Sequence, residues 1–284
     1  MRLWLLFAII TTVFWGVWGA FIEIPEKGGF PATLGYSVWA LTMIPCALVA
    51  LKIIGFKLDR ELRTVLLGST VGLLGAGGQL ILFEALRSGP AYLVFPIISM
   101  YPVITVALSA ILLHERTGRR AGIGILLALP AIVLLSYQPP GSSAAHGYGW
   151  LIQAFCVMAM WGVQAYVMKF STNSIKPESV YFYMMATAVV LIPVAIWMTD
   201  FSQPIQWGFR GPWLAAIIQA LNAIGALTLV YALRHGKAII VVPMTALAPV
   251  LTVIISLILY RVLPTPPVAI GMVLASAAMV LMAE

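Results

Sequence analysis

The stretch ALRSGPAYLVFPIISMYPVITVALSAILL, from Ala85 to Leu113, occurs again as ALRHGKAIIVVPMTALAPVLTVIISLILY, from Ala232 to Tyr260. The two copies align without a gap at one constant offset (234 − 87 = 147). Apolar helices resemble one another by chance, but an arginine, two prolines and two hydroxyl residues in register do not. The equivalent pairs are Arg87 and Arg234, Pro96 and Pro243, Pro102 and Pro249, Thr105 and Thr252, and Ser109 and Ser256. The chain is therefore predicted to be an internal duplication.

The composition predicts an integral membrane protein. With 62% hydrophobic and 9% charged residues and a mean hydropathy of +1.03, the chain has more apolar surface than a soluble fold of this size could bury. The apolar segments are about 20 residues long, enough for helices to cross a hydrocarbon core of about 30 Å, and none alternates like a barrel strand. We expect an all-α, polytopic fold without a separate soluble domain.

Ten membrane-spanning helices are expected, five in each copy. Their predicted ranges are 3–22, 32–54, 64–86, 91–113, 121–137, 148–170, 179–199, 211–233, 238–260 and 266–283. The segment between the fifth and sixth helices is rich in Pro, Gly, Ser and Ala, as in a linker. The predicted organisation is a first repeat at 1–137, a linker at 138–147 and a second repeat at 148–284.

The N-terminal apolar run has features of a cleaved signal peptide, but it too is duplicated. Trp15-Gly16-Val17 recurs as Trp161-Gly162-Val163 (161 − 15 = 146), so we expect this run to be the first helix of the first repeat. Five helices per repeat is an odd number, so the second repeat must enter the membrane from the opposite side. Inverted repeats of this kind are typical of secondary transporters, whose binding site lies near the midplane between the two halves.

The distribution of basic residues predicts the orientation. Most of the 16 Lys and Arg residues are expected on the side of the membrane that carries the N-terminus. The four exceptions, expected on the opposite side, are Lys27, Arg87, Arg210 and Arg261. By the positive-inside rule, both termini are expected in the cytoplasm, and we expect the protein in a bacterial cytoplasmic (inner) membrane. The net charge of +7 then reflects topology and contact with anionic lipid, with no nucleic-acid footprint.

Several motifs resemble a known family over nearly the whole chain. They are the Trp-Gly pairs Trp15-Gly16 and Trp161-Gly162, the P-x5-PV-x-TV-x2-S pattern of the fourth and ninth helices, and His114-Glu115-Arg116 followed by Gly122-x-Gly124. The sequence resembles the drug/metabolite transporter superfamily, specifically its ten-helix EamA-like branch. The resemblance implies a transporter of small metabolites with a cavity lined mainly by helices 1, 3, 4, 6, 8 and 9. One departure is Val262, which stands at the position equivalent to Glu115, where the family often has a second Glu.

Amides and indoles within the expected spans are the main candidates for substrate contacts. A buried amide is costly unless it faces the protein interior, which selects Gln79, Gln164 and Asn222. Indole rings offer flat apolar walls and an N–H donor for a cation or an aromatic group. The tryptophans at these depths are Trp15, Trp18 and Trp161.

Hydroxyl residues form matching stripes on the fourth and ninth helices. Thr105 on one, and Thr245 and Thr252 on the other, lie at helical spacing from the prolines. Two interpretations stay open, because such hydroxyls either face a substrate or bind backbone carbonyls within and between helices. The predicted substrate-binding set comprises these three threonines, the amides, the indoles and Tyr101.

The paired prolines are predicted hinges. Pro96, Pro102, Pro243 and Pro249 each remove a backbone hydrogen bond within a span. At membrane depth such breaks persist where protein or a water-filled cavity satisfies the freed groups. A static kink is the alternative, but the presence of both prolines in both copies favours a hinge or a site-lining break.

Two carboxylates are candidates for ion coupling, Glu23 and Glu84. Both lie near the ends of spans, where an ion pair with a neighbouring cation is the competing interpretation. No charge falls clearly at mid-membrane, which favours a neutral or zwitterionic substrate, such as an amino acid or amine. Lys169, at the end of the sixth helix, is the main residue that works against this inference.

These features favour a secondary transporter that works by alternating access. A scaffold or receptor, a passive permeation pathway and, less favoured, an intramembrane enzyme are the alternatives. The sequence has no HExxH, GxSxG or nucleotide-binding P-loop motif, so neither catalysis nor ATP hydrolysis is expected. We expect no metal and no cofactor. The expected partners are a small-molecule substrate and the lipid bilayer, and a homodimer through the fifth or tenth helix stays open.

Overall fold

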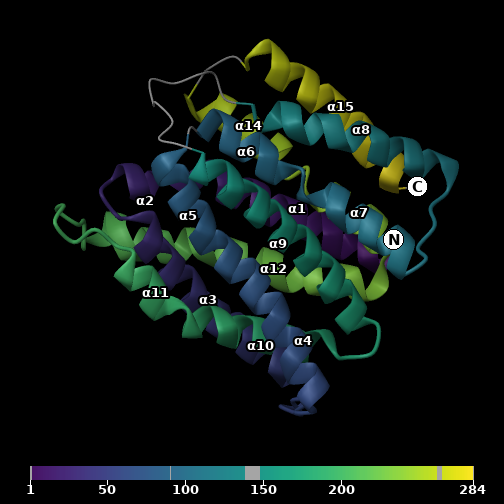
Figure 1. Ribbon diagram of the computed structural model, residues 1–284, viewed down its shortest axis with the longest axis horizontal. Coiled ribbons are helices and arrows are strands. Elements are labelled where there is room, and N and C mark those ends of the chain that lie inside the picture. The colour runs from purple at the N-terminus through teal and green to yellow at the C-terminus, as the bar shows by residue number, and fades with distance from the viewer. Residues whose placement is uncertain (1, 90, 138–147, 261–263, 284) are drawn as a thin grey trace.

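A computed structural model describes residues 2–89, 91–137, 148–260 and 264–283. Within these ranges every regular element is helical (Figure 1). The elements are α1 (Leu3–Phe21), α2 (Glu23–Lys27), α3 (Ala32–Ile53), α4 (Leu62–Gly72), η1 (Leu73–Gly77), α5 (Gly78–Ser88), α6 (Ala91–Ser99), α7 (Tyr101–Leu112), α8 (Arg119–Leu135), α9 (Gly149–Thr172), α10 (Pro177–Val190), α11 (Ile192–Trp197), η2 (Phe209–Trp213), α12 (Leu214–His235), α13 (Ala238–Thr245), α14 (Pro249–Tyr260) and α15 (Pro266–Ala283). The predicted linker at 138–147 and the departure at Val262 lie outside the described residues.

These elements form the spans of an all-α, polytopic membrane protein. In the described ranges, nine helical segments of at least 18 residues are apolar enough to cross a membrane. The helix α8, with 17 residues, occupies the place of the fifth predicted helix and is just long enough to span. Both termini lie at the same end of the bundle (Figure 1), as an even number of crossings requires.

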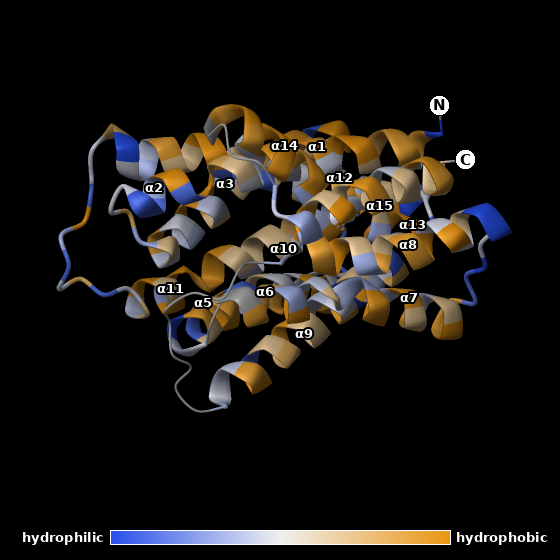
Figure 2. Ribbon diagram, turned by 90° about the horizontal axis from the view of Figure 1, so that it is seen from above, coloured by the Kyte–Doolittle hydropathy of each residue, from blue (hydrophilic) through white to orange (hydrophobic). Residues whose placement is uncertain are grey.

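The surface has the polarity of a membrane protein. Figure 2 shows hydrophobic residues along the flanks of the helices and hydrophilic residues mainly at the two ends of the bundle. Large apolar side chains on the flanks are far more exposed than a soluble fold tolerates, with Leu126 at 70%, Ile152 at 73% and Val190 at 73%. Such side chains are suited to contact with lipid chains rather than with water.

Contacts between the two halves occur in equivalent pairs: when a helix of one repeat packs on a helix of the other, the equivalent helices also pack on each other. Helix α1 packs on α12, and the equivalent helix α9 packs on α5; likewise α1 packs on α14 and α9 on α7. The pairs α3 with α12 and α10 with α4 follow the same rule. The peripheral helices α8 and α15, which are equivalent helices of the two copies, pack on each other (Figure 1). Exchanging the two copies therefore leaves this contact unchanged. Each half therefore completes the core of the other half.

Several spans are interrupted, including the seventh, which breaks at Leu191 between α10 and α11, and three that bear on the shared core. The fourth span breaks at Met100 between α6 and α7, and the ninth breaks between α13 and α14. Their prolines lie at these breaks: Pro96 and Pro243 are inside α6 and α13, and Pro102 and Pro249 are in the first turns of α7 and α14. The third span, expected to be a continuous α-helix, contains the π-helical turn η1 between α4 and α5.

Candidate functional site

The crossing of α9 with the third span brings together three of the predicted substrate residues, Trp161, Gln164 and Tyr101. The indole N–H of Trp161 donates to the carbonyl oxygen of Gly75 at 3.2 Å. The amide of Gln164 packs on the same glycine, since a Cβ placed there would lie 2.2 Å from the Gln164 Nε2 atom. The Tyr101 ring meets the Trp161 ring edge-on, with ring centroids 6.2 Å apart, and Gln79 lies in the first turn of α5, directly after η1. A side chain at position 75 would therefore displace the amide of Gln164 from its present position.

The π-helical turn η1 shapes this crossing. The N–H of Gly78 bonds to the carbonyl of Gly75 across the end of the turn, and Trp161 adds a second donor to that oxygen. A π-turn inserts one residue into an α-helix, so it changes the faces on which the flanking side chains lie. Sequence periodicity did not predict it, because the contact that accompanies it comes from a helix of the other repeat.

The second copy builds the same indole-to-carbonyl contact. Trp15, the equivalent of Trp161, donates from Nε1 to the carbonyl oxygen of Asn222 at 3.3 Å. The next turn differs between the copies, because Trp18 stands at the position equivalent to Gln164. Its indole donates to the Gln219 Oε1 atom at 3.0 Å. Trp15 and Trp18 therefore both bind the other half, and the two copies surround the core with different polar groups.

The threonine stripes resolve into contacts with backbone carbonyls. The hydroxyl of Thr105 donates to the carbonyl oxygen of Gly162 at 2.8 Å, and its equivalent Thr252 donates to that of Gly16 at 2.9 Å. Thr245 bonds within its own helix, to the carbonyls of residues 241 and 242 at 3.1 and 3.2 Å. The sequence left open whether these hydroxyls face a substrate or bind backbone carbonyls. In the structure, all three threonine hydroxyls donate to backbone carbonyls.

The three predicted amides are placed differently. Gln79, Gln164 and Asn222 are all partly buried, and none of their side-chain amides has a hydrogen bond to another residue in the described ranges. An amide at membrane depth that lacks a protein partner is costly unless water or a ligand satisfies it. These groups are therefore among the polar side chains that remain available for binding, together with the buried hydroxyl of Ser109, which also lacks a partner.

The candidate coupling carboxylates both form ion pairs at the surface. Glu23 pairs with Lys27 one turn later, and Glu84 pairs with Arg87 at 3.3 Å. In both pairs the side chains are largely exposed, between 45% and 76%. Exposed ion pairs of this kind contribute little to the free energy of unfolding. Both contacts agree with the interpretation of these carboxylates as ion-pair partners, which was the alternative to a role in ion coupling.

Sequence reasoning singled out Lys169 but missed one buried carboxylate, Glu178, and one buried amide, Gln219. Lys169 and Glu178 are 9% and 6% exposed; Glu178 accepts a hydrogen bond from the Tyr231 hydroxyl at 2.7 Å. Glu178 was expected in a loop, because the predicted helix began one residue later, whereas α10 begins at Pro177. Gln219, 6% exposed, was missed because the equivalent residue in the first copy is Gly72, so the duplication gave no signal.

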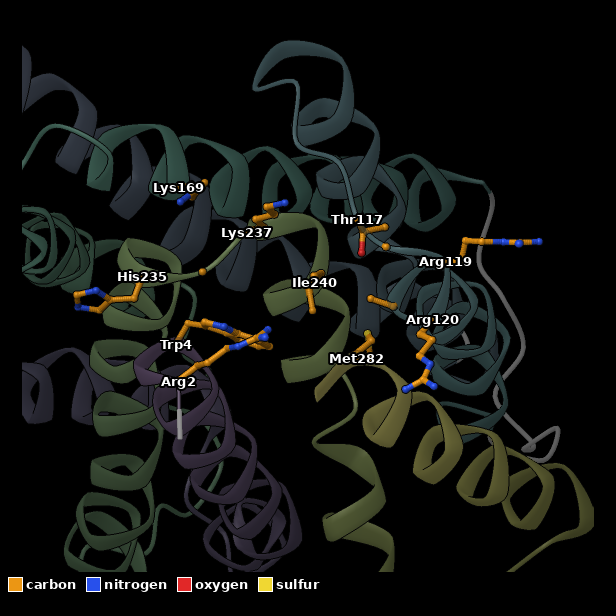
Figure 3. A pocket seen from close by; sticks show the side chains of 13 residues that line it. Arg2, Trp4, Thr117, Arg119, Arg120, Lys169, His235, Lys237, Ile240 and Met282 are labelled. Carbon is orange, nitrogen blue, oxygen red and sulfur yellow. The ribbon is translucent and has the colours of Figure 1, made fainter. Parts of the chain in front are cut away.

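Cavities lie at both ends of the described part of the bundle. The larger, of about 660 Å³, is at the end that carries both termini and lies among the starts of α1, α8 and α13 and the end of α15 (Figure 3). The smaller, of about 240 Å³, lies at the other end, between Glu26 and Arg87. None of the predicted substrate residues lines either cavity. In the described part of the chain, no three His, Cys, Asp or Glu side chains gather as metal ligands would.

Comparison with known proteins identifies the duplicated unit. The sequence pattern of the EamA-like transporter family matches residues 2–137 and, separately, residues 148–283. An uncharacterized protein of Methanocaldococcus jannaschii is 34% identical over 134 residues, which make up 95% of that protein but 46% of this chain. A solved structure, described only as the crystal structure of a protein, has the same fold, with a TM-score of 0.79 at 21% identity over 98% of this chain and 95% of that one.

Proposed function

This chain belongs to the EamA-like transporter family, and we propose that it moves a small neutral or zwitterionic metabolite across the membrane by secondary transport with alternating access. The class of substrate we propose is amino-acid-like or amine-like. The binding site is formed where the two halves meet, by the amides of Gln79, Gln164 and Asn222 and the rings of Trp18, Tyr101 and Trp161.

The proposal depends on three side-chain amides that have no hydrogen-bond partner in the described protein. They lie near two equivalent hydrogen bonds that join the halves. Trp15 and Trp161 each bind a carbonyl of the opposite half near the middle of a span, and the amides that lack protein partners lie on the same turns. Hydrogen-bonding groups held in this way suit a substrate that carries donors and acceptors but little net charge. Charged side chains that are buried, Lys169 and Glu178, lie toward the N-terminal end of the bundle instead.

Alternating access needs an element that has two arrangements. The breaks between α6 and α7 and between α13 and α14 are equivalent, and each adjoins the threonine that binds the first helix of the other half. We propose that bending at these breaks opens the binding site first to one end of the bundle and then to the other. The threonine contacts hold the two halves together during this change.

If the prolines act as hinges, replacing them should reduce transport but should change the stability of the fold little. Pro102→Ala and Pro249→Ala are expected to reduce flux several-fold, because a continuous helix resists the bend, while the free energy of unfolding changes by about 1 kcal/mol or less. Flux in proteoliposomes and melting of the purified variants measure the two effects. Pro130→Ala, in the peripheral helix α8, is the matched control and should keep normal flux. Normal flux in both hinge variants would show that the breaks are static.

The transport function is tested in two steps. Melting of the purified protein against amino acids, amines, nucleobases, sugars and nucleotide sugars identifies ligands, since a ligand at about 100 times its dissociation constant stabilises a fold by about 2.7 kcal/mol. Each ligand is then assayed for counterflow in proteoliposomes without ATP. A carrier accelerates uptake of labelled ligand when unlabelled ligand is inside, which a passive pathway does not. Binding without flux would support a receptor instead, and chemical conversion of the ligand an enzyme.

The same proposal includes the orientation. Both termini lie at one end of the bundle (Figure 1), and most of the basic loop residues belong to that end, which by the positive-inside rule is the cytoplasmic one. We propose a bacterial inner membrane as the location.

A further inference from the structure

The cavity at the end that carries both termini has an unusually basic lining. Arg2, Lys169 and Lys237 line it from three different elements, and the start of α8 contributes Arg119 and Arg120. No described lining residue carries a carboxylate. A concave site of about 660 Å³ lined by one sign of charge concentrates the opposite charge.

The lining side chains differ in direction. Figure 3 shows Arg2 and Trp4 reaching from the start of α1 toward Ile240, while Arg119 extends away from the other labelled side chains. Lys237 lies between Lys169 and Thr117 in this view. Arg2 and Lys237 are therefore placed to contact a ligand in the cavity, and Arg119 is not. The Lys237 ammonium donates one of its three hydrogens to the carbonyl oxygen of Arg116, which leaves two for a ligand.

Lys169 is a buried cation without a paired carboxylate. Its side chain is about nine-tenths buried, at 9% exposure, and its ammonium donates to the carbonyl oxygen of Leu233 at 2.9 Å. No carboxylate in the described ranges lies within ion-pair distance of it. Glu115 acts on Lys169 electrostatically from beyond ion-pair distance, and its carboxylate accepts the backbone N–H of Ile239 at 3.0 Å. Arg234 adds a second positive charge beside Lys169. One carboxylate does not balance these cations, so the cavity favours an anion.

The first turn of α8 adds backbone donors. Thr117, Gly118 and Ala121, as well as the two arginines, line the cavity at this helix start. No side chain caps the N-terminus of this 17-residue helix. The N–H groups and the dipole of an uncapped helix start favour an anion, and phosphate in particular.

We propose that this cavity is a binding site for a phosphate group, separate from the site of the transported substrate. Guanidinium and ammonium donors on several elements suit the tetrahedral oxygens of a phosphate. Two sources carry this chemistry: the headgroup of an anionic phospholipid, which the position at the end of the bundle allows, and a soluble phosphate ester. None of the residues proposed to bind the transported substrate lines the cavity, so the two sites share no residue.

Binding is measured on the full-length protein, purified and delipidated in a neutral detergent. One arm adds inorganic phosphate or glycerol 3-phosphate against chloride at equal ionic strength, and a second adds phosphatidylglycerol against phosphatidylcholine. The readouts are the melting temperature and the number of bound lipids by native mass spectrometry. Stabilisation in the first arm assigns a soluble phosphate, and stabilisation in the second arm alone assigns a lipid headgroup.

The double variant Arg2→Gln, Lys237→Gln tests the site itself. We expect the half-saturating concentration of the effective ligand to rise at least about tenfold, which corresponds to about 1.4 kcal/mol. The matched control is Lys52→Gln, Lys57→Gln, which removes the same charge from two exposed lysines that do not line the cavity and should change it less than about twofold. Both pairs are exposed, so the unliganded melting temperature should stay close to that of the wild type. No stabilisation in either arm, or equal losses in the two double variants, would overturn the proposal.

Discussion

Replacing Gly162 by alanine is expected to destabilise the protein strongly, although alanine is the better helix former. A Cβ at this position would lie 2.6 Å from the Cβ of Ile104 and 2.8 Å from the carbonyl oxygen of Tyr101. Neither atom can move aside without shifting α7, so α9 and α7 must separate. Overpacking of this kind costs about 1–3 kcal/mol. Separation also weakens the bond from Thr105 to the carbonyl of Gly162, which adds to the loss.

The duplication supplies an independent repeat of this experiment. Gly16 is the equivalent glycine, and a Cβ on it would lie 2.5 Å from the Cβ of Leu251 and 3.0 Å from the carbonyl oxygen of Ala248. We expect Gly16→Ala and Gly162→Ala to lower the melting temperature by similar amounts. Melting in detergent measures the effect.

The matched control is a glycine with space around it. In α8, the nearest side-chain atom to a Cβ placed on Gly122 is Thr117 Cγ2, at 3.7 Å, an ordinary contact. Gly122→Ala should therefore be neutral or stabilising by up to about 1 kcal/mol, as intrinsic helix propensity dictates. Equal melting temperatures for Gly122→Ala and Gly162→Ala would show that close packing at the crossing does not limit stability.

The sequence predicted much of the architecture because the duplication restricts the possible folds. The offset between Arg87 and Arg234, together with an odd number of helices per copy, predicted inverted repeats, and the packing of α1 on α12 and of α9 on α5 follows that exchange. Composition predicted membrane spans. Their internal breaks were predicted only where proline marks them; the π-turn η1 carries no such mark, since its sequence, LLGAG, is compatible with an ordinary helix.

The candidate site was less predictable, because its contacts are between helices. The sequence placed Thr105 and Thr252 on stripes but could not distinguish a hydroxyl that faces a cavity from one that binds a carbonyl of another helix. That distinction depends on Gly16 and Gly162, which let the helices approach closely enough for the bond. Gln219 was missed for a related reason: it is identified by its partner Trp18 and not by any repeated pattern.

The roles of two amides in the shared core can be separated by one substitution. Gln164→Met replaces an amide that has no protein partner with an apolar chain of similar length. We expect stability to be unchanged or slightly raised, because no hydrogen bond within the protein is lost. Transport should fall about fivefold or more, since a hydrogen bond to the substrate is worth about 1 kcal/mol or more. Counterflow of the ligand found by melting measures transport.

Gln219→Met is the matched comparison, with the opposite expectation for stability. Gln219 is buried and accepts the indole N–H of the half-buried Trp18. Its loss leaves that N–H without a protein partner and should destabilise the protein by about 1–3 kcal/mol. If Gln164→Met destabilises the protein as much as Gln219→Met does and leaves counterflow intact, Gln164 is a packing residue and the substrate binds elsewhere. If the two variants separate as expected, the core contains one amide that holds the halves together and another that is available to the substrate. That division follows from the difference between the copies, because Trp18 and Gln164 occupy equivalent positions and only one of them finds a partner in the protein.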